Sequence, residues 1–182
     1  MNTRTFREYI YTVDNDITYI TFEQKNKNKH LSIIDTFNLD KFLSYKFSWH
    51  VGLYREYYYI NATPYLVEDG IQKRKLVFLH YYLLDFPDCK YIDHINNNTL
   101  DNRELNLRPT NNRDNLRNRR GLNKNNKTGY RNVILSSGSY RIQLQLDGKN
   151  FMFPEKFENV DEAGAFAKAM RLQYYGEFAG NG

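Results

Sequence analysis

An alternating segment near the end of the chain is the sequence feature that most restricts how the chain can fold. In SYRIQLQLDGKNFMF, polar residues alternate with the apolar residues Tyr140, Ile142, Leu144 and Leu146. This period of two is typical of a strand with one buried face. Asp147-Gly148 predicts a type I′ hairpin, since both central residues of that turn need a positive φ. The preceding YRNVILSSGS supplies another strand and a turn, so the region predicts three antiparallel strands.

A helical pattern follows these strands. Asn159 is a suitable N-cap with Glu162 three residues later, and Gly176 suits the C-terminal end of a helix. Between them, the residues with helical spacing are Ala163, Phe166, Ala167, Met170 and Tyr174. One amphipathic helix covers only one face of such a sheet. The polar face, with Arg141, Gln143 and Gln145, is therefore expected to stay open.

The rest of the chain separates by composition. Residues 1–88 are rich in β-branched and aromatic residues, with short alternating runs, and predict a small, mostly β region. Residues 89–120 are rich in Asn and Arg, and residues 121–128 are polar without apolar periodicity, which predicts a linker. Residues 129–182 contain the three strands and the helix. The fold class expected from these regions is α+β.

Composition excludes several classes of protein. The single cysteine, Cys89, excludes a disulfide framework and a zinc site built from several cysteines. No apolar run approaches the roughly 20 residues of a membrane span. The N-terminal MNTRTFREYIYTVDND lacks the apolar stretch of a signal peptide. A cytoplasmic protein without membrane contact is therefore expected.

Positive charge is concentrated in one part of the chain. The net charge is +5, and residues 101–131 alone contain nine Lys and Arg residues against three Asp and Glu residues. Such a segment favours a polyanionic partner, usually nucleic acid. A solvated helix face without a partner is the alternative.

The segment YIDHINNNTLDNRELNLR (91–108) places an acid beside a histidine and follows them with asparagines. Asp93 and His94 are neighbours, so their side chains diverge at the end of a strand. An imidazole can deprotonate water near neutral pH, and a carboxylate can bind a hard divalent ion such as Mg²⁺. Thr110 is a good N-cap for a short basic helix whose Asn115 offers a second oxygen ligand. This combination predicts phosphodiester hydrolysis.

Residues 91–118 resemble the HNH (ββα-metal) nuclease motif of phage and intron homing endonucleases. The matching positions, in the family's order, are Asp93-His94, Asn96 to Thr99, Asp101 to Arg103, Asn106 to Arg108, and Asn115. The resemblance implies that His94 is the general base and that Asn106 braces the loop behind it. It also implies that Asp93 and Asn115 bind one Mg²⁺ or Mn²⁺ ion, with no zinc. The upstream KLVFLHYYLL looks like the family's LHR segment, with Tyr81 where an arginine is common.

Regions on both sides carry further resemblances. IIDTFNLDKFLSYKFSW (33–49) is similar to an N-terminal region found with these nucleases, which implies DNA contact by residues 1–88. The segment from NKTGYRNV to GEFA resembles the plant ethylene-response-factor (APETALA-type) DNA-binding domain. The expected fold is thus an N-terminal β region, a central ββα-metal motif, and a C-terminal three-stranded antiparallel sheet packed on one helix.

These resemblances imply a phage- or intron-encoded homing endonuclease that acts in the cytoplasm of a bacterial host. One motif per chain suggests a monomer that nicks one strand of double-stranded DNA. The residues expected to bind DNA are Arg108, Arg113, Arg117, Arg119, Arg120, Arg131, Arg141, Gln143 and Gln145. The arginines of 113–120 would hold phosphates, whereas Arg141 and the two glutamines would read bases.

Other interpretations stay open. Asp93-His94 could be a capping acid beside a surface histidine, and Asn111, Asn112 and Asn118 compete with Asn115 as ligands. His80 could pack in a core or contact a phosphate. A DNA-binding regulator that does not cleave, or a structural or RNA-binding module, would also account for the basic segment.

Overall fold

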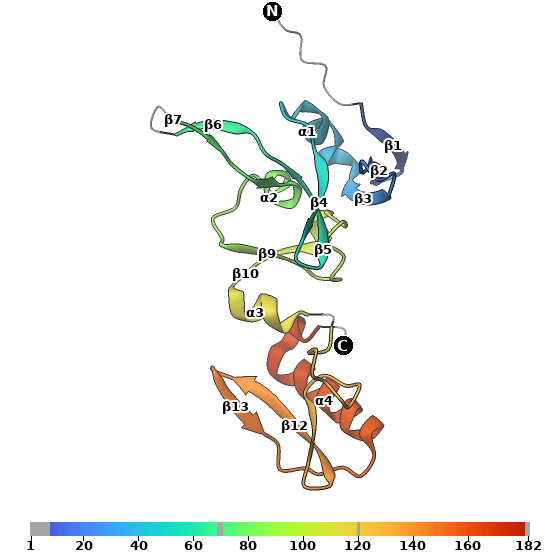
Figure 1. Cartoon of the computed structure of the whole chain (residues 1–182), viewed down its shortest axis with the longest axis vertical. Helices are drawn as coiled ribbons and strands as arrows, with labels where there is room; N and C mark the ends of the chain where they lie inside the picture. Colours follow the sequence, from blue (N-terminus) through green and yellow to red (C-terminus); the bar gives the residue numbers. More distant parts are fainter. Residues whose placement is uncertain (1–7, 69–70, 120, 181–182) are drawn as a thin grey trace, which may run out of the picture. The chain divides into compact units, whose positions relative to one another are not determined.

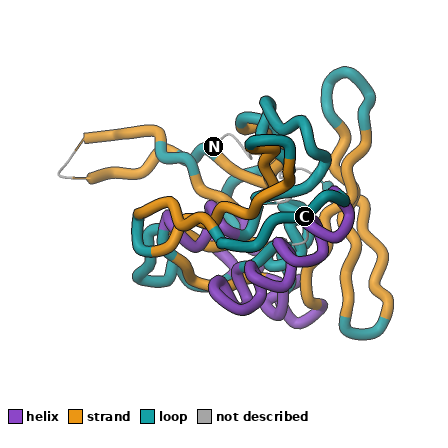
Figure 2. Tube along the Cα trace, turned by 90° about the horizontal axis from the view of Figure 1, so that it is seen from below, coloured by secondary structure: helices purple, strands orange, loops and turns teal. Residues whose placement is uncertain are grey.

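The computed structural model describes residues 8–68, 71–119 and 121–180. Its described residues form a mixed α+β fold with several small antiparallel sheets and four α-helices (Figures 1 and 2), which confirms the predicted fold class at this level. The chain divides into two compact units, residues 1–110 and 111–182, so the boundary falls inside the Asn- and Arg-rich region 89–120. Within the described ranges, none of the helices has the length and hydropathy that crossing a membrane requires.

The first unit contains two three-stranded antiparallel sheets. The first has the strand order β1 (Ile10–Asp14), β2 (Ile17–Glu23), β3 (Lys29–Asp35), and the second has the order β4 (His50–Tyr54), β5 (Tyr57–Ala62), β8 (Val77–Phe78). Two-stranded hairpins are formed by β6 (Tyr65–Glu68) with β7 (Ile71–Arg74) and by β9 (Tyr91–His94) with β10 (Leu107–Thr110). The helical segments are η1 (Thr36–Asn38), α1 (Leu39–Ser44), α2 (Leu79–Leu83) and η2 (Glu104–Asn106).

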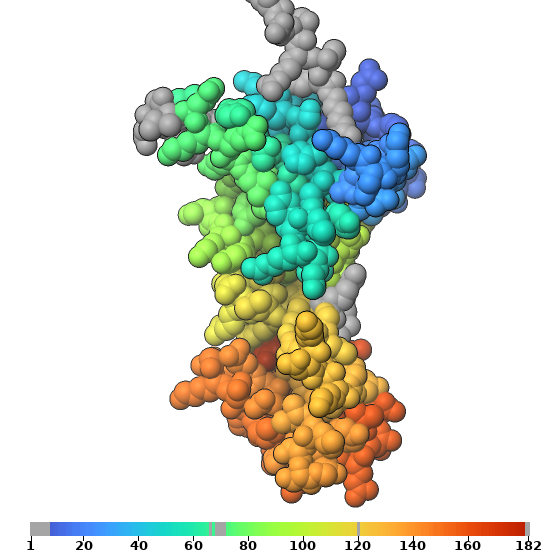
Figure 3. Space-filling view, viewed as in Figure 1, coloured from blue at the N-terminus to red at the C-terminus, as the bar shows by residue number. Residues whose placement is uncertain are grey.

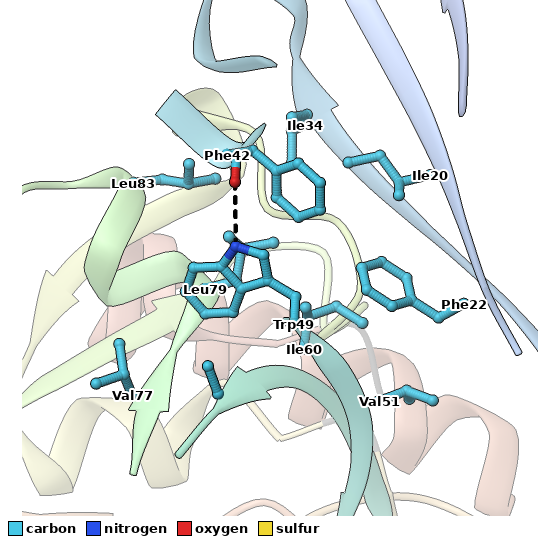
Figure 4. Close-up of a cluster of buried hydrophobic side chains, with 11 residues drawn as sticks. Ile20, Phe22, Ile34, Phe42, Trp49, Val51, Ile60, Val77, Leu79 and Leu83 are labelled. Atoms are coloured by element: carbon cyan, nitrogen blue, oxygen red, sulfur yellow. Dashed lines mark hydrogen bonds between the residues drawn. The ribbon is translucent and has the colours of Figure 1, made fainter. Parts of the chain in front are cut away.

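One apolar core joins the two three-stranded sheets with α1 and α2. Fully buried Trp49 lies among these side chains, and its Nε1 donates to the Phe42 carbonyl oxygen at 3.3 Å (Figure 4). Strand β2 shows the alternation that its sequence predicts, with Ile20 and Phe22 buried in this core. Leu100, from the loop between β9 and β10, packs against the same cluster. The core therefore extends to the segment that carries Asp93 and His94.

The second unit begins with α3 (Asn112–Arg117) and continues with a three-stranded antiparallel sheet, β11 (Val133–Ser136), β12 (Ser139–Leu146) and β13 (Lys149–Met152). It ends with α4 (Val160–Tyr175) and η3 (Gly176–Phe178). The turn between β12 and β13 has φ of 48° at Asp147 and 78° at Gly148, which confirms the predicted positive φ at both positions.

A compact apolar core lies between the sheet of the second unit and α4. Ile142 and Leu144 of β12 are fully buried with Ala163 and Ala167 of α4. Helix α4 begins as its sequence predicts, because the Asn159 side chain accepts hydrogen bonds from two backbone amides of the first turn. The apolar alternation along β12 is thus used to bury one face of the sheet.

Arg131 is buried in the second unit, where it caps backbone carbonyl groups at or just after the ends of α3 and η3. Its side chain is 3% exposed, and its guanidinium donates to the carbonyl oxygens of Arg117 (2.8 Å), Arg119 (2.7 Å) and Ala179 (3.3 Å). The carbonyl ends of helical segments carry partial negative charge, so a cation there is favourable. Arg131, expected from the sequence to contact DNA, is therefore held inside the unit by backbone carbonyl groups.

Gly180 makes room for this cap. Its φ is +67°, and a Cβ atom there would lie 2.5 Å from Arg131 Nη1 and 2.9 Å from the Arg119 carbonyl oxygen. We expect Gly180→Ala to lower the free energy of unfolding of the second unit by about 1–3 kcal/mol, because it combines a strained φ with two steric conflicts. Urea unfolding followed by far-UV circular dichroism measures this loss.

Gly121→Ala is the matched control, since a Cβ atom at Gly121 meets no atom within 4 Å and its φ is not in the left-handed region. Equal unfolding free energies for the two variants would contradict the proposed packing of Gly180 on Arg131.

Candidate functional site

The β9–β10 hairpin brings Asp93 and Arg108 together. They face each other across the antiparallel pair, and Asp93 Oδ2 accepts hydrogen bonds from Arg108 Nε at 3.0 Å and Nη2 at 2.7 Å. Both residues are buried, at 6% and 8% exposed. Arg108, expected from the sequence among the DNA-binding residues, is thus a buried partner of Asp93. A pair of this kind fixes the direction of the carboxylate, because neither charge can be left alone in the interior without a large cost.

His94 ends β9 and is buried as well, at 5% exposed. Burial lowers the pKa of His94 from 6.5 to about 4, while hydrogen bonding to the Asn102 side chain and the charges of Asp93 and Asp101 act in the opposite direction. The imidazole is therefore neutral at pH 7 and has a lone pair that can accept a proton. His94 therefore lies in the interior of the unit and not on the surface, where the alternative interpretation of Asp93-His94 would put it.

A second histidine lies against the first. His80, in α2, is 5% exposed, and its ring centroid lies 4.9 Å from that of His94 with the planes nearly perpendicular. Burial lowers the pKa of His80 well below its usual value, and the nearby His94 lowers it further. The rings of Phe78 and Tyr59 lie against His80 at centroid distances of 5.5 Å and 5.9 Å. These contacts place His80 in an aromatic layer behind His94.

The loop after His94 is braced by Asn106. The Asn106 Oδ1 atom accepts from the Asn96 backbone amide at 2.9 Å, and its Nδ2 donates to the Asp101 carbonyl oxygen at 2.8 Å. One carboxamide thus joins both arms of the loop. Asp101 continues the network, since its carboxylate accepts from the Asn96 side chain and from the guanidinium of Arg103. The asparagines of this segment are hydrogen-bonding parts of a folded loop.

Contacts with the N-terminal sheet hold the same loop from outside, and sequence reasoning missed them. Asn102 is 1% exposed, and its Nδ2 donates to Ser32 Oγ of β3 at 3.0 Å. The Ile33 amide and carbonyl groups pair with Leu100 and Asn102 of the loop at 2.8 Å and 2.7 Å. These partners are about 70 residues apart in the chain, so no local sequence pattern could indicate them.

The predicted metal ligands are divided between the units. Asp93 belongs to the first unit, together with the predicted catalytic residues His94 and Asn106, whereas Asn115 lies half-buried on α3 in the second unit. Helix α3 also starts one residue later than Thr110 predicts: Thr110 ends β10, and the Asn111 side chain caps α3 by accepting from the Asp114 amide at 2.9 Å. Thr110 cannot be this cap because its backbone is used in the β9–β10 pairing.

The first unit offers a divalent cation a carboxylate beside His94, that of Asp93. The described residues contain no group of three or more His, Cys, Asp and Glu side chains that could hold a metal. Mg²⁺ does not need such a cage, because it is often held by one or two carboxylates together with waters and substrate phosphate oxygens. Asp93 supplies one carboxylate, and Arg108 shares one of its oxygens. An ion would therefore bind beside a guanidinium or take its place.

The residues expected to bind DNA in the second unit differ in exposure. Arg113 and Arg119 are exposed, Arg117 is half-buried, and Arg120 lies outside the described residues. On β12, Gln145 is exposed while Arg141 and Gln143 are half-buried, on the face opposite to the α4 core. Arg141 donates to the Phe153 carbonyl oxygen at 3.0 Å, which holds its side chain along the sheet.

We compared the chain with protein families, curated proteins and solved structures. No family model, no curated protein and no solved structure matches the chain. Function is therefore inferred from the side chains and contacts described above.

We expect Asn106→Asp to lower the free energy of unfolding of the first unit by about 1–3 kcal/mol. An aspartate can still accept from the Asn96 amide, but its second oxygen faces the Asp101 carbonyl oxygen, to which Asn106 donates at 2.8 Å. Urea unfolding monitored by Trp49 fluorescence reports on this unit. Asn28→Asp is the control, because Asn28 is an exposed residue of the loop between β2 and β3. An Asn106→Asp protein as stable as the control would remove the bracing role.

The two buried histidines also predict a pH dependence of stability. Their folded pKa values lie below the unfolded value of about 6.5, so the unfolded state binds more protons as the pH falls from about 6.5 toward 4. The stabilisation is complete above the unfolded pKa and is lost through this range. Each histidine contributes a slope of at most about 1.4 kcal/mol per pH unit.

Urea unfolding at pH 7, 6 and 5 measures this slope. The double variant His80→Gln/His94→Gln should show a flatter dependence than the wild type. Parallel curves for the wild type and the double variant would contradict the burial of two neutral imidazoles.

Proposed function

We propose that this chain is a divalent-metal-dependent DNA endonuclease of the HNH (ββα-metal) type. The observation that carries the proposal is the buried, neutral imidazole of His94 beside the Asp93 carboxylate, on a hairpin whose connecting loop is braced by Asn106. A proton acceptor next to an oxygen ligand is the minimum that metal-assisted hydrolysis of a phosphodiester needs from a protein.

The role of His94 follows from its protonation state. The neutral imidazole takes a proton from a water molecule as the water oxygen attacks phosphorus, the bond from phosphorus to the 3′ oxygen breaks, and the leaving 3′ oxygen takes a proton from solvent. The products of such an attack have 5′-phosphate and 3′-hydroxyl ends. Asp93, held in place by Arg108, is the carboxylate of this unit that would bind the ion. A bound Mg²⁺ or Mn²⁺ supplies positive charge for the reacting phosphate. Asn115 as its second protein ligand stays a prediction.

The order of elements supports the same assignment. β9 and β10 are followed in the chain by α3, which is the order of a ββα-metal motif. We take the second unit, with its three antiparallel strands and α4, as a DNA-binding module of the ethylene-response-factor type. Its open face would read bases through Arg141, Gln143 and Gln145, since Arg pairs with guanine and Gln with adenine in the major groove. The proposed enzyme is a monomer that acts on double-stranded DNA in the cytoplasm of its host.

A DNA-binding regulator that does not cleave is the second candidate. It would use the basic residues and the sheet face of the second unit, but it would have no use for an interior imidazole kept neutral next to a carboxylate. Burying His94 and Asp93 has a cost in stability. Their retention favours the nuclease.

We expect His94→Ala to abolish cleavage of supercoiled plasmid DNA in Mg²⁺ or Mn²⁺ while DNA binding persists, because the proton acceptor acts on water and not on the duplex. Conversion of supercoiled to nicked plasmid measures cleavage, EDTA controls for the metal requirement, and a gel-shift assay measures binding.

His50→Ala is the matched control, since His50 is a histidine of the same unit in β4 and should leave cleavage unchanged. Nicking by His94→Ala at the wild-type rate would reject His94 as the base. A wild-type protein that binds DNA but never nicks it would favour the regulator.

A further inference from the structure

A wide groove crosses the second unit. Its volume is about 770 Å³, and its walls are α3 with the residues that follow it, the β12–β13 hairpin, and Tyr175 at the end of α4. In Figure 3 the yellow residues of α3 meet the orange residues of the hairpin here, with dark red C-terminal residues between them. The groove lies wholly within residues 111–182, so it belongs to one compact unit.

The groove has a surplus of positive charge. Four arginines line it, at positions 113, 117, 119 and 131, and no acidic residue is among the described residues of its lining. The nearby acids are Asp114, which pairs with Arg117 at 3.0 Å, and Asp147, which lies 3.8 Å from Arg113. Two carboxylates against four guanidinium groups leave a site that attracts anions.

Two of the four arginines are fixed parts of the groove. Arg131 is buried with its guanidinium on three carbonyl groups, and its Nε has no hydrogen-bond partner. The Arg117 guanidinium lies 4.3 Å from the centre of the Tyr175 ring and donates to the Gln145 carbonyl oxygen at 3.3 Å. These contacts place two charges permanently in the wall, without the entropy cost of ordering a flexible side chain on binding.

The other two arginines are available to a ligand. The Arg113 side chain is 56% exposed, and its ion pairs with Asp114 and Asp147 are long, at 3.7 Å and 3.8 Å. The pair with Asp147 is exposed on both sides and contributes about 0–1 kcal/mol, so a ligand can displace it. Arg119 is exposed and donates to the Asn123 side chain, also at the surface. Each guanidinium offers a planar fork of donors that matches the oxygens of a phosphate.

Most of the remaining side chains that line the groove are polar. Carboxamides dominate them, from Asn111, Asn112, Asn132 and Gln145, and the Tyr175 ring is covered by Arg117. Binding pockets for small organic molecules are lined mostly by apolar and aromatic side chains, whereas this groove has one of each, Leu116 and Tyr175. An open groove of arginines and carboxamides instead suits a polar, repeating anion.

We propose that this groove binds the phosphodiester backbone of duplex DNA next to the open face of β12. The position of Gln145 supports this, because its backbone oxygen holds Arg117 in the groove while the same strand carries Arg141 and Gln143 on the open face. Backbone contact at the hairpin end of β12 would set the position of that face on the duplex. The inference rests on the proposed function in one respect, that DNA is the ligand of this chain.

The double variant Arg113→Gln/Arg119→Gln tests the groove in the full chain, with EDTA present to prevent cleavage. Fluorescence anisotropy with two unrelated DNA duplexes of equal length should show the same loss of affinity for both, about tenfold or more. The slope of log K against log salt concentration should decrease in magnitude by about 2, since two phosphate contacts are removed. Both residues are exposed, so far-UV circular dichroism should be unchanged.

Lys156→Gln/Lys168→Gln is the matched control, because it removes the same charge from exposed positions of the same unit outside the groove. An affinity and salt slope equal to those of this control would overturn the proposal. Displacement of the duplex by inorganic phosphate at matched ionic strength, equally from the wild type and from the Arg113→Gln/Arg119→Gln variant, would also overturn it, since the phosphate would then compete outside the groove. A loss confined to duplex RNA would reject DNA as the partner.

Failure of this inference is distinguishable from failure of the proposed function. If the chain nicks plasmid DNA but the groove variant binds DNA like the control, the proposed nuclease function stands and the proposed DNA binding by the groove is rejected. If DNA binding depends on Arg113 and Arg119 but the chain never nicks DNA with Mg²⁺ or Mn²⁺, the proposed DNA binding by the groove stands and the proposed nuclease function is rejected.

Discussion

The buried polar groups of the loop between β9 and β10 draw most of their hydrogen-bond partners from inside the first unit, and the position of His94 depends on these contacts. Asn102 and Asn106 are almost completely buried, and a buried polar group left unpaired costs about 1–3 kcal/mol. Asn106 supplies partners from within the loop, and β3 supplies them from outside. His94 starts this loop, so its position depends on both sets of contacts.

Buried charges in both units follow one rule, which is that each guanidinium finds oxygen acceptors. Arg108 is paired with a carboxylate, whereas Arg131 and Arg171 donate to backbone carbonyl groups. Burial and the neighbouring arginines lower the pKa of Arg131 to about 10, which still leaves it charged at neutral pH. The two solutions have different consequences: Arg108 neutralises Asp93, and Arg131 adds a fixed positive charge to the second unit.

Sequence predicted the features that depend on near neighbours in the chain. The positive φ values of Asp147 and Gly148, the cap at Asn159 and the burial of Ile142 and Leu144 follow from patterns within a few residues. It did not predict the burial of Arg108 and Arg131, because basic residues are exposed by default and their partners come from the fold. The cap at Asn111 was missed for a related reason, since Thr110 was needed by β10.

The pairing of Ser32 and Ile33 with residues 100–102 also has a kinetic consequence. Contacts between segments about 70 residues apart form late and slow folding, because a long loop must close before they stabilise anything. During synthesis, β3 leaves the ribosome well before its partners in the loop exist. The arrangement around His94 therefore cannot assemble until nearly the whole first unit has been made, and incomplete chains lack it.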